Sequence, residues 1–344
     1  TNAFVETAGL DGGAGFDEVS NFGNLRVAGS NSIFVGEFNI GALVSANMRS
    51  SSSVNAIGIA GENVDNQGAA SASADALLRA DGATYSVYGS SIGQRGLATA
   101  TATGIEGDAM LDNSATNFGM LDIRSQAEVR SLERVFALFA NSNQQLEFEA
   151  NSAAVGLAGG AGAENITNAE ESSLEVLAEA IGTIQGVTTT YPWFSNLRRT
   201  VNLVDATADA SAFGLELEGG DAAVANLGDI EVTSTASVLA LAVSNQYEET
   251  SARANADATA RAWGIHGHGS ANITQPERHS HSVDTHLATW NAIFSLPRGG
   301  IGIFNRGRGL AVAVPSGARV DRSDAKGKAE PVLDVVSHRT NHRP

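Results

Sequence analysis

An Asn-x-Gly turn recurs along this chain at intervals of about 50 residues, and this repeat constrains the fold more than any other feature. Self-similarity of this period is typical of solenoids, propellers and other repeat architectures. Asparagine suits tight corners because it tolerates the left-handed conformation and its amide hydrogen-bonds to its own backbone. The corner asparagines, one of them in a degenerate copy, are Asn21, Asn66, Asn117, Asn168, Asn226 and Asn305. A second degenerate copy begins at Gln275.

A second marker, a glycine followed by an aliphatic residue, precedes each later corner. Its six copies are Gly58-Ile59, Gly104-Ile105, Gly156-Leu157, Gly214-Leu215, Gly264-Ile265 and Gly302-Ile303. Two independent markers that keep the same order six times indicate one repeating unit of structure rather than chance similarity.

Small and apolar residues alternate with polar ones on both sides of these markers, and a period of two is the signature of a β-strand. Alanine occupies every second position from Ala252 to Ala262, and again from Ala206 to Ala212. Because alanine is a weak strand former in isolation, such runs make sense where two sheets pack face to face at close range. A helix would distribute these alanines around its surface, so we reject a helical interpretation.

The repeat therefore predicts an all-β fold, a parallel β-solenoid (β-helix) of about seven coils with long lateral loops. Each unit would form one broad coil, and adjacent coils would lie about 4.8 Å apart. Two smaller coils per unit are an alternative that the sequence leaves open. The expected organisation is a Gly-rich edge segment (1–18), the solenoid (19–314) and a basic C-terminal tail (315–344). Stacked coil upon coil, the corner asparagines could form an amide ladder.

This pattern resembles the Ala-, Gly- and Asn-rich β-solenoid repeats of bacterial extracellular proteins, such as autotransporter passengers and filamentous adhesins. The resemblance covers about residues 19–314 and implies an extracellular or cell-surface location. Families of this kind include adhesins, structural fibres and some enzymes, so the resemblance implies an architecture more than an activity.

Composition excludes several classes of function. The chain has no cysteine, which rules out disulfides and Cys-ligated metals. Its net charge of −17 argues against nucleic acid as a partner. No stretch approaches the roughly 18 uninterrupted apolar residues of a membrane helix, so we expect no membrane span. The charge is uneven, because residues 298–344 carry nine Lys and Arg against four acids.

One glycine-rich segment suggests a calcium ion, although the predicted fold requires no cofactor. The stretch from Gly12 to Ser20 matches a single copy of the nonapeptide repeat that binds Ca²⁺ when it occurs in tandem. Asp17 would supply the carboxylate, since Ca²⁺ prefers oxygen ligands. A glycine-rich turn without an ion is the alternative interpretation.

Two His-x-His pairs suggest a transition metal. His266 with His268, and His279 with His281, would each present two imidazoles on one face of a strand. The second pair stands where other repeats place inward-facing Ile or Val. A buried, unpaired histidine is costly, so a register slip that turns both side chains outward is the favoured explanation.

The longest excursions between strands carry most of the aromatic residues, and loops on a rigid scaffold are where binding usually occurs. Aromatic residues combined with arginine are typical of protein interfaces, and exposed rings can also stack on sugars. The candidate interface residues are Tyr191, Trp193, Phe194, Arg198, Arg199 and Trp290. The alternative is that these loops fold back as small satellite cores.

These features favour a non-catalytic structural protein that joins head to tail with copies of itself into a surface fibre or filament. An open solenoid ends in unpaired strand edges, which invite pairing, and the basic tail could lie on a neighbouring subunit as an added strand. The first alternative is an adhesin or glycan-binding passenger that uses its aromatic loops against surface glycans.

A solenoid enzyme that degrades glycans is a further alternative, because carboxylate pairs such as Glu147 and Glu149 share a strand face. We predict no catalytic or cofactor-binding residue, since no nucleophile elbow, phosphate loop or dinucleotide motif occurs.

Overall fold

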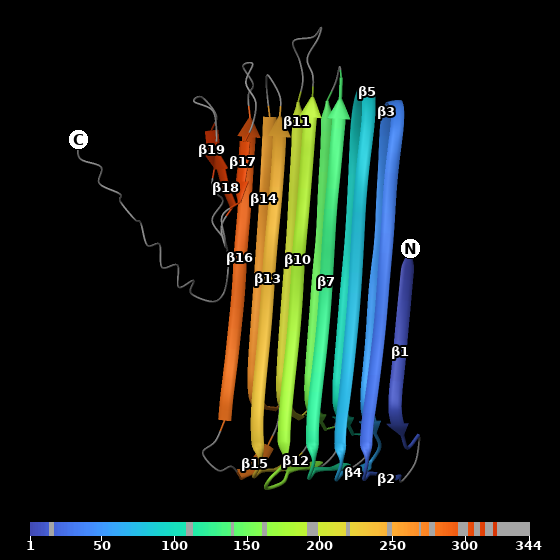
Figure 1. Ribbon diagram of the computed structural model, residues 1–344, viewed down its shortest axis with the longest axis vertical. Coiled ribbons are helices and arrows are strands. Elements are labelled where there is room, and N and C mark those ends of the chain that lie inside the picture. Colours follow the sequence, from blue (N-terminus) through green and yellow to red (C-terminus); the bar gives the residue numbers. More distant parts are fainter. Residues whose placement is uncertain are drawn as a thin grey trace, which may run out of the picture.

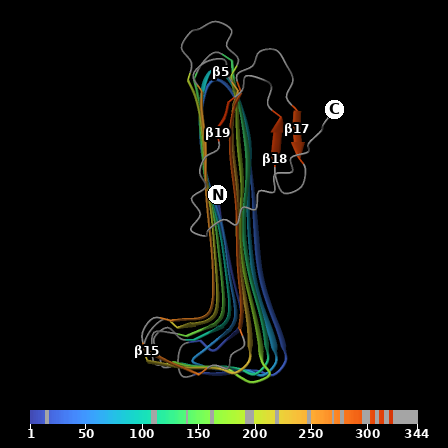
Figure 2. The ribbon, with the colours of Figure 1, turned by 90° about the vertical axis from the view of Figure 1, so that its left-hand side faces the viewer.

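The computed structural model is a flat, two-armed parallel β-solenoid (Figures 1 and 2). It describes residues 1–13, 17–107, 113–138, 141–159, 164–190, 199–217, 221–245, 250–267, 270–274 and 279–294, and three short strands beyond them. Side chains are described up to His266, except at residues 164, 221, 245 and 250. These residues contain strands and no helix, which confirms the all-β prediction.

Each complete coil consists of an ascending arm, a descending arm and a short base strand (Figure 1). In the first two complete coils one continuous strand forms both arms, β3 (Asn24–Ala60) and then β5 (Ala69–Glu106). Later ascending arms are β7 (Met120–Ala137), β10 (Ser173–Thr190), β13 (Asp229–Asn245) and β16 (His279–Phe294). The other descending arms are β1 (Asn2–Asp11), β8 (Ser142–Ala158), β11 (Thr200–Leu217) and β14 (Thr250–Gly267).

Six short strands form a separate parallel sheet at the base, which appears as a foot in the end-on view of Figure 2. These strands are β2 (Glu18–Asn21), β4 (Asn63–Asn66), β6 (Asn113–Asn117), β9 (Glu164–Asn168), β12 (Asp221–Asn226) and β15 (Ser270–Thr274). The described residues thus contain five complete coils, with β1 and β2 before them and β16 after them.

Each repeat unit forms one coil, and each coil stacks on the next in parallel register. Asn66 pairs with Asn117 in the base sheet, and Ala70 pairs with Leu121 in the ascending sheet. The arms are 17 or 18 residues long in β7 and β8, which corresponds to about 55–60 Å. The alternative of two smaller coils per unit is therefore wrong, because a single turn of the chain uses the whole repeat.

The two arms run close together (Figure 2). Many of the buried side chains between them are alanines, such as Ala100, Ala127 and Ala210. Ser125 Oγ on β7 donates a hydrogen bond to the Ala100 carbonyl on the descending part of β5, at 2.8 Å. Ser234 Oγ on β13 reaches the Ala210 carbonyl on β11 in the same way, at 2.9 Å. A hydroxyl on one sheet touches the backbone of the other, so the alternating alanines are a requirement of the narrow gap.

The two arms diverge near the base (Figure 2). Larger aliphatic side chains at the lower ends of the arms and in the base strands are buried. Burial of a side chain of this kind contributes about 1.5–3 kcal/mol. The fully buried members of this group are Ile59, Ile105, Leu121, Ile123, Leu157, Ile166, Leu174 and Leu215.

A column of glycines marks the bend where each descending arm turns into the base. A side chain on Gly58 or Gly104 would begin only 2.5 Å from the carbonyl oxygen of the next glycine in the column. The close approach of the backbones therefore requires glycine. Gly9 lies opposite Gly58 in the same column, so the column begins one coil earlier than the sequence markers indicate.

The parallel pattern ends after β16. There β17 (Gly302–Asn305) pairs antiparallel with β18 (Leu310–Ala313), and β19 (Arg319–Asp321) pairs antiparallel with β16. Asn305 and Gly302, which the sequence assigns to the last copies of the two markers, both lie in β17, so this assignment is wrong. Thirty residues separate Gln275 from Asn305, too few for two full arms and a base strand. Apart from β19, the predicted tail lies outside the described residues.

Candidate functional site

The corner asparagines of successive coils form a column of buried side chains in the base. The Nδ2 of each amide donates to the Oδ1 of the next, from Asn21 to Asn66 at 2.7 Å, from Asn66 to Asn117 at 2.8 Å and from Asn117 to Asn168 at 2.9 Å. Asn168 then donates to Asn226 at 2.8 Å. Each inner amide both donates and accepts, which satisfies polar groups that would otherwise be costly to bury.

The corners at Asn21, Asn117 and Asn168 each supply a further donor to their asparagine. Gly119 N donates to Asn117 Oδ1 at 3.3 Å. No glycine follows Asn168 in the degenerate copy, and here the Ser172 hydroxyl lies 2.8 Å from Asn168 Oδ1 and replaces the glycine N–H. The same corner contains Glu171 in the left-handed conformation, with φ 70°. The degenerate copy therefore keeps the column at the expense of a strained residue. Gln275, the next corner, lies outside the described residues.

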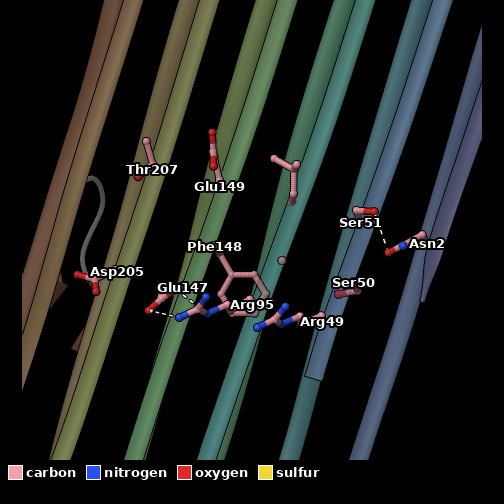
Figure 3. Close-up of a pocket in the computed structure, with 12 residues that line it drawn as sticks. Asn2, Arg49, Ser50, Ser51, Arg95, Glu147, Phe148, Glu149, Asp205 and Thr207 are labelled. Carbon is pink, nitrogen blue, oxygen red and sulfur yellow. Dashed lines mark hydrogen bonds and ion pairs between the residues drawn. The ribbon is translucent and has the colours of Figure 1, made fainter. Parts of the chain in front are cut away.

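The outer face of the descending arms carries a hollow of about 460 Å³ (Figure 3). A row of charged residues from four successive coils crosses it, consisting of Arg49, Arg95, Glu147 and Asp205. Arg95 binds Glu147 through two contacts, Nε to Oε2 at 2.7 Å and Nη2 to Oε1 at 3.3 Å. Figure 3 shows the Arg49 side chain beside that of Arg95. Arg49 forms no ion pair with any residue that the structure describes.

A second hollow, of about 410 Å³, adjoins the first and shares Arg49 and Arg95 with it. Its lining includes the amides of Asn47 and Gln145. Gly93 leaves room for one of them, because Asn47 Oδ1 lies 2.5 Å from the point where a side chain on Gly93 would begin. Guanidinium and amide groups of this kind donate to carboxylates and hydroxyls.

Our sequence analysis named Glu147 and Glu149, which line the first hollow, but it did not predict either hollow, although the chain contains the signal. Counting back nine residues from Gly58, Gly104, Gly156 and Gly214 gives Arg49, Arg95, Glu147 and Asp205 in turn. The row becomes visible only when the glycines are known to share one column.

His266 lies on β14 in an aromatic cluster. Its ring centroid is 5.0 Å from those of both Phe213 and Trp263, which stack on each other at 4.8 Å. Glu216 Oε1 lies 3.9 Å from His266 Nδ1. His268 lies outside the described residues. Among the side chains that the structure describes, no three His, Cys, Asp or Glu residues gather in a way that could hold a metal ion.

The second histidine pair begins β16. Its backbone pairs His279 with Ile230 and His281 with Val232, and the register continues unchanged to Phe294. The register slip that we predicted for this coil is therefore wrong. Pairing with β13 along the whole of β16 fixes the register, which the missing corner motif does not alter. A transition metal at these histidines stays a prediction.

The calcium segment is described on both sides of residues 14–16. Asp17 accepts a hydrogen bond from Asn63 N through its backbone carbonyl at 3.0 Å. Gly13 N donates to the Asp11 carboxylate at 2.9 Å. These contacts tie the segment to the next coil and to its own turn. Binding of Ca²⁺ by Asp17 stays a prediction.

Most of the predicted interface residues lie outside the described residues. This applies to Tyr191, Trp193, Phe194 and Arg198. Arg199 is exposed, and its backbone N donates to Asn141 Oδ1 at 2.7 Å. Trp290 lies in β16, and its backbone pairs with that of Leu241 in β13.

A different group of aromatics lies near the top of the ascending arms. The rings of Tyr85 and Phe136 are stacked with centroids 5.1 Å apart, and Phe38 meets Tyr85 edge-on at 5.8 Å. One face of each stacked ring is therefore occupied by its neighbour in the next coil. This arrangement stabilises the stack of coils more directly than it offers ring faces to a sugar.

The chain was compared with protein-family models, with curated proteins and with solved structures, and none of them matches it. Within the described part of the chain, no helix has the length and apolar character needed to cross a membrane.

Proposed function

We propose that the chain is a structural solenoid of the cell surface, copies of which join end to end into a fibre. The observation that carries this proposal is the edge of β3. Residues 24–48 of β3 pair with β5 on one side, and no described strand lies on the other side. An unpaired parallel edge of this length is a template for a further strand.

The side chains along this edge favour association with a second copy. Phe34, Phe38, Ile40 and Leu43 are 66–76% exposed. Burial of such side chains contributes up to about 1.5–3 kcal/mol each. A second copy would present a coil of the same width and strand direction, and a head-to-tail contact that does not close on itself generates a filament.

Electron microscopy and sedimentation of the purified chain over a range of concentrations would test this proposal. We expect rods of constant width whose length increases with concentration. Wild-type protein that remains monomeric at every concentration would contradict the proposal.

The double variant Phe34→Lys and Ile40→Lys tests whether the β3 edge is the contact. It places two charges on the edge while leaving the interior unchanged, so we expect folded protein with shorter rods. Phe118→Lys is the matched control, because Phe118 is also an exposed aromatic (52%) but lies at a corner between stacked coils. An equal effect of both variants would argue against assembly through this edge.

The two hollows favour a second candidate function, the binding of acidic surface glycans. Arg49 offers a guanidinium that no described acid engages, and Asn47 and Gln145 add amide groups beside it. Titration with uronic-acid oligosaccharides would test this function, and Arg49→Ala should weaken binding at least about tenfold. Arg79→Ala is the control, because Arg79 lies on the ascending arm and binds Asp81. Equal affinities of the two variants would exclude the hollows as the site.

A further inference from the structure

Two acids face the interior of the two arms, and no base does among the side chains that the structure describes. Among the described side chains between the top of the arms and the glycine bend, which exclude those of β16, Glu37 and Glu133 are the titratable ones that face inward. The remaining inward positions carry mostly alanine, serine, glycine and larger aliphatic residues. An uncompensated carboxylate in such a place is costly.

Glu37 and Glu133 belong to one row, and Gly82 separates them. Glu37 pairs with Gly82 in register, and Gly82 pairs with Glu133. A side chain on Gly82 would overlap the Glu133 carboxyl group, so this carboxyl group occupies the space that the glycine leaves. It thereby approaches the coil that holds Glu37. On the far side of Glu133 the row continues with Gly186.

The contacts of Glu133 are those of a fully buried, hydrogen-bonded carboxyl group. Gln94 Nε2 donates to its Oε2 at 2.6 Å, and Thr84 Oγ1 donates to its Oε1 at 3.4 Å. Glu37 accepts from Asn39 Nδ2 at 2.7 Å through Oε1, whereas its buried Oε2 has no partner among the described residues. Among the described side chains, no positive charge forms an ion pair with either acid.

Among the described side chains, Glu37 of β3 is the charged group that faces Glu133. The other elements packed around it, on β5, β8 and β10, present Gly82, Thr84, Gln94, Gln144 and Gly186. None of these titrates. Burial and, to a lesser extent, the charge of Glu37 raise the pKa of Glu133 from 4.5 to about 8.

We propose that Glu133 is a proton-operated lock on the N-terminal edge of the solenoid, in which the neutral carboxyl group over Gly82 holds β3 against β5 and the carboxylate loosens it. Ionisation places two negative charges on either side of one glycine in the interior of the arms. The strand best able to yield is β3, because residues 24–48 pair with a described strand on one side only. This inference does not depend on the proposed fibre function.

The direction of the pH dependence follows from the raised pKa. The folded protein binds the proton more tightly than the unfolded chain does, so the stabilisation is complete below about pH 4.5. It is lost as the pH rises towards about 8. Within this window the unfolding equilibrium constant should increase about tenfold for each pH unit through this group alone.

Glu133→Gln isolates the contribution of the lock, because glutamine imitates the neutral carboxyl group and cannot ionise. Unfolding of the wild type and this variant should be compared from about pH 5 to about pH 9. We expect the wild type to lose stability relative to Glu133→Gln as the pH rises. Glu149→Gln, which changes an exposed acid on β8, should follow the wild type. Parallel curves for the wild type and Glu133→Gln would overturn the proposal.

Two further measurements locate the effect and do not require Glu133→Gln to fold. Infrared spectra of the wild type should contain the absorption of a protonated carboxyl group that disappears as the pH rises past about 8. Hydrogen exchange of residues 30–48 should be faster in the wild type than in Glu37→Gln at about pH 8.5 and equal to it at about pH 6, since the variant removes the facing charge. The absence of the carboxyl band at neutral pH, or equal exchange at the higher pH, would also overturn the proposal.

Discussion

Asn117 depends on its neighbours in the column on both sides, because its amide accepts from Asn66 and donates to Asn168. Asn117→Ala removes both hydrogen bonds and leaves two buried partners incomplete. We expect the free energy of unfolding to fall by about 3 kcal/mol, which denaturant titration would measure. Asn151→Ala is the control, since that amide faces outward and contacts Glu149, and it should cost less than about 0.5 kcal/mol. Equal losses would show that the column does not stabilise the fold.

Glu171 offers a prediction of the opposite sign. Its left-handed backbone conformation is strained for any residue with a side chain, whereas glycine adopts it freely. We therefore expect Glu171→Gly to raise the free energy of unfolding by about 0.5–1 kcal/mol. Glu170→Gly should lower it instead, because Glu170 does not have a positive φ and gains only backbone freedom in the unfolded chain. Calorimetry of the two variants would distinguish these outcomes, and a loss of stability in both would refute the argument.

The strands follow from the sequence to different degrees. The period-two alanine runs predict β11 and β14 and the face that each buries, because a narrow gap between sheets tolerates little else. Nothing in the sequence marks β3 and β5 as continuous over the top of the arms. The register of β16 could not be predicted from the sequence, because the corner motif before this strand is missing. In the structure its pairing with β13 sets the register.

The two acids of the interior, Glu37 and Glu133, could have been predicted from the sequence to lie in one row. Counting 16 residues on from Asn21, Asn66 and Asn117 gives Glu37, Gly82 and Glu133. The signal is a row across coils, and it emerges only after the corners are aligned. The charged row on the outer face was missed for the same reason. No geometry could be predicted for the loop that contains Tyr191, Trp193 and Phe194, because its sequence lacks the alternation that is typical of a strand.

The glycine bend gives an element-level prediction. A side chain on Gly156 would collide with the carbonyl oxygen of Gly214 and approach Leu174 to 2.7 Å. Gly156→Ala should therefore force the descending arms apart and cost about 2–3 kcal/mol in thermal or denaturant unfolding. Gly36→Ala is the matched control, because no atom lies within 4 Å of the added carbon, and it should be neutral or slightly stabilising. Equal tolerance of both changes would contradict the close stacking.

For the molecule as a whole, the register between coils predicts which coil can be removed, because a deletion brings residues of two formerly separated coils side by side. Deletion of residues 118–168 joins Asn117 to Ala169 and brings Gly82 beside Gly186, which we expect to leave a folded, shorter solenoid. Deletion of residues 67–117 brings Glu37 directly against Glu133. We expect this second protein to have a much lower midpoint of thermal unfolding by circular dichroism. Similar midpoints for the two deletions would show that the rows do not govern stacking.

The serine hydroxyls that bridge the arms show that the two arms lie close together at these positions, and this has an evolutionary consequence. Inward positions are restricted to residues that fit the gap, whereas most outward positions along an arm meet only solvent and their own row. Mutations should therefore accumulate on the outward half over many generations. Evolutionary relationships among such proteins would be traced most reliably from the inward-facing residues, which occupy every second position of the arms.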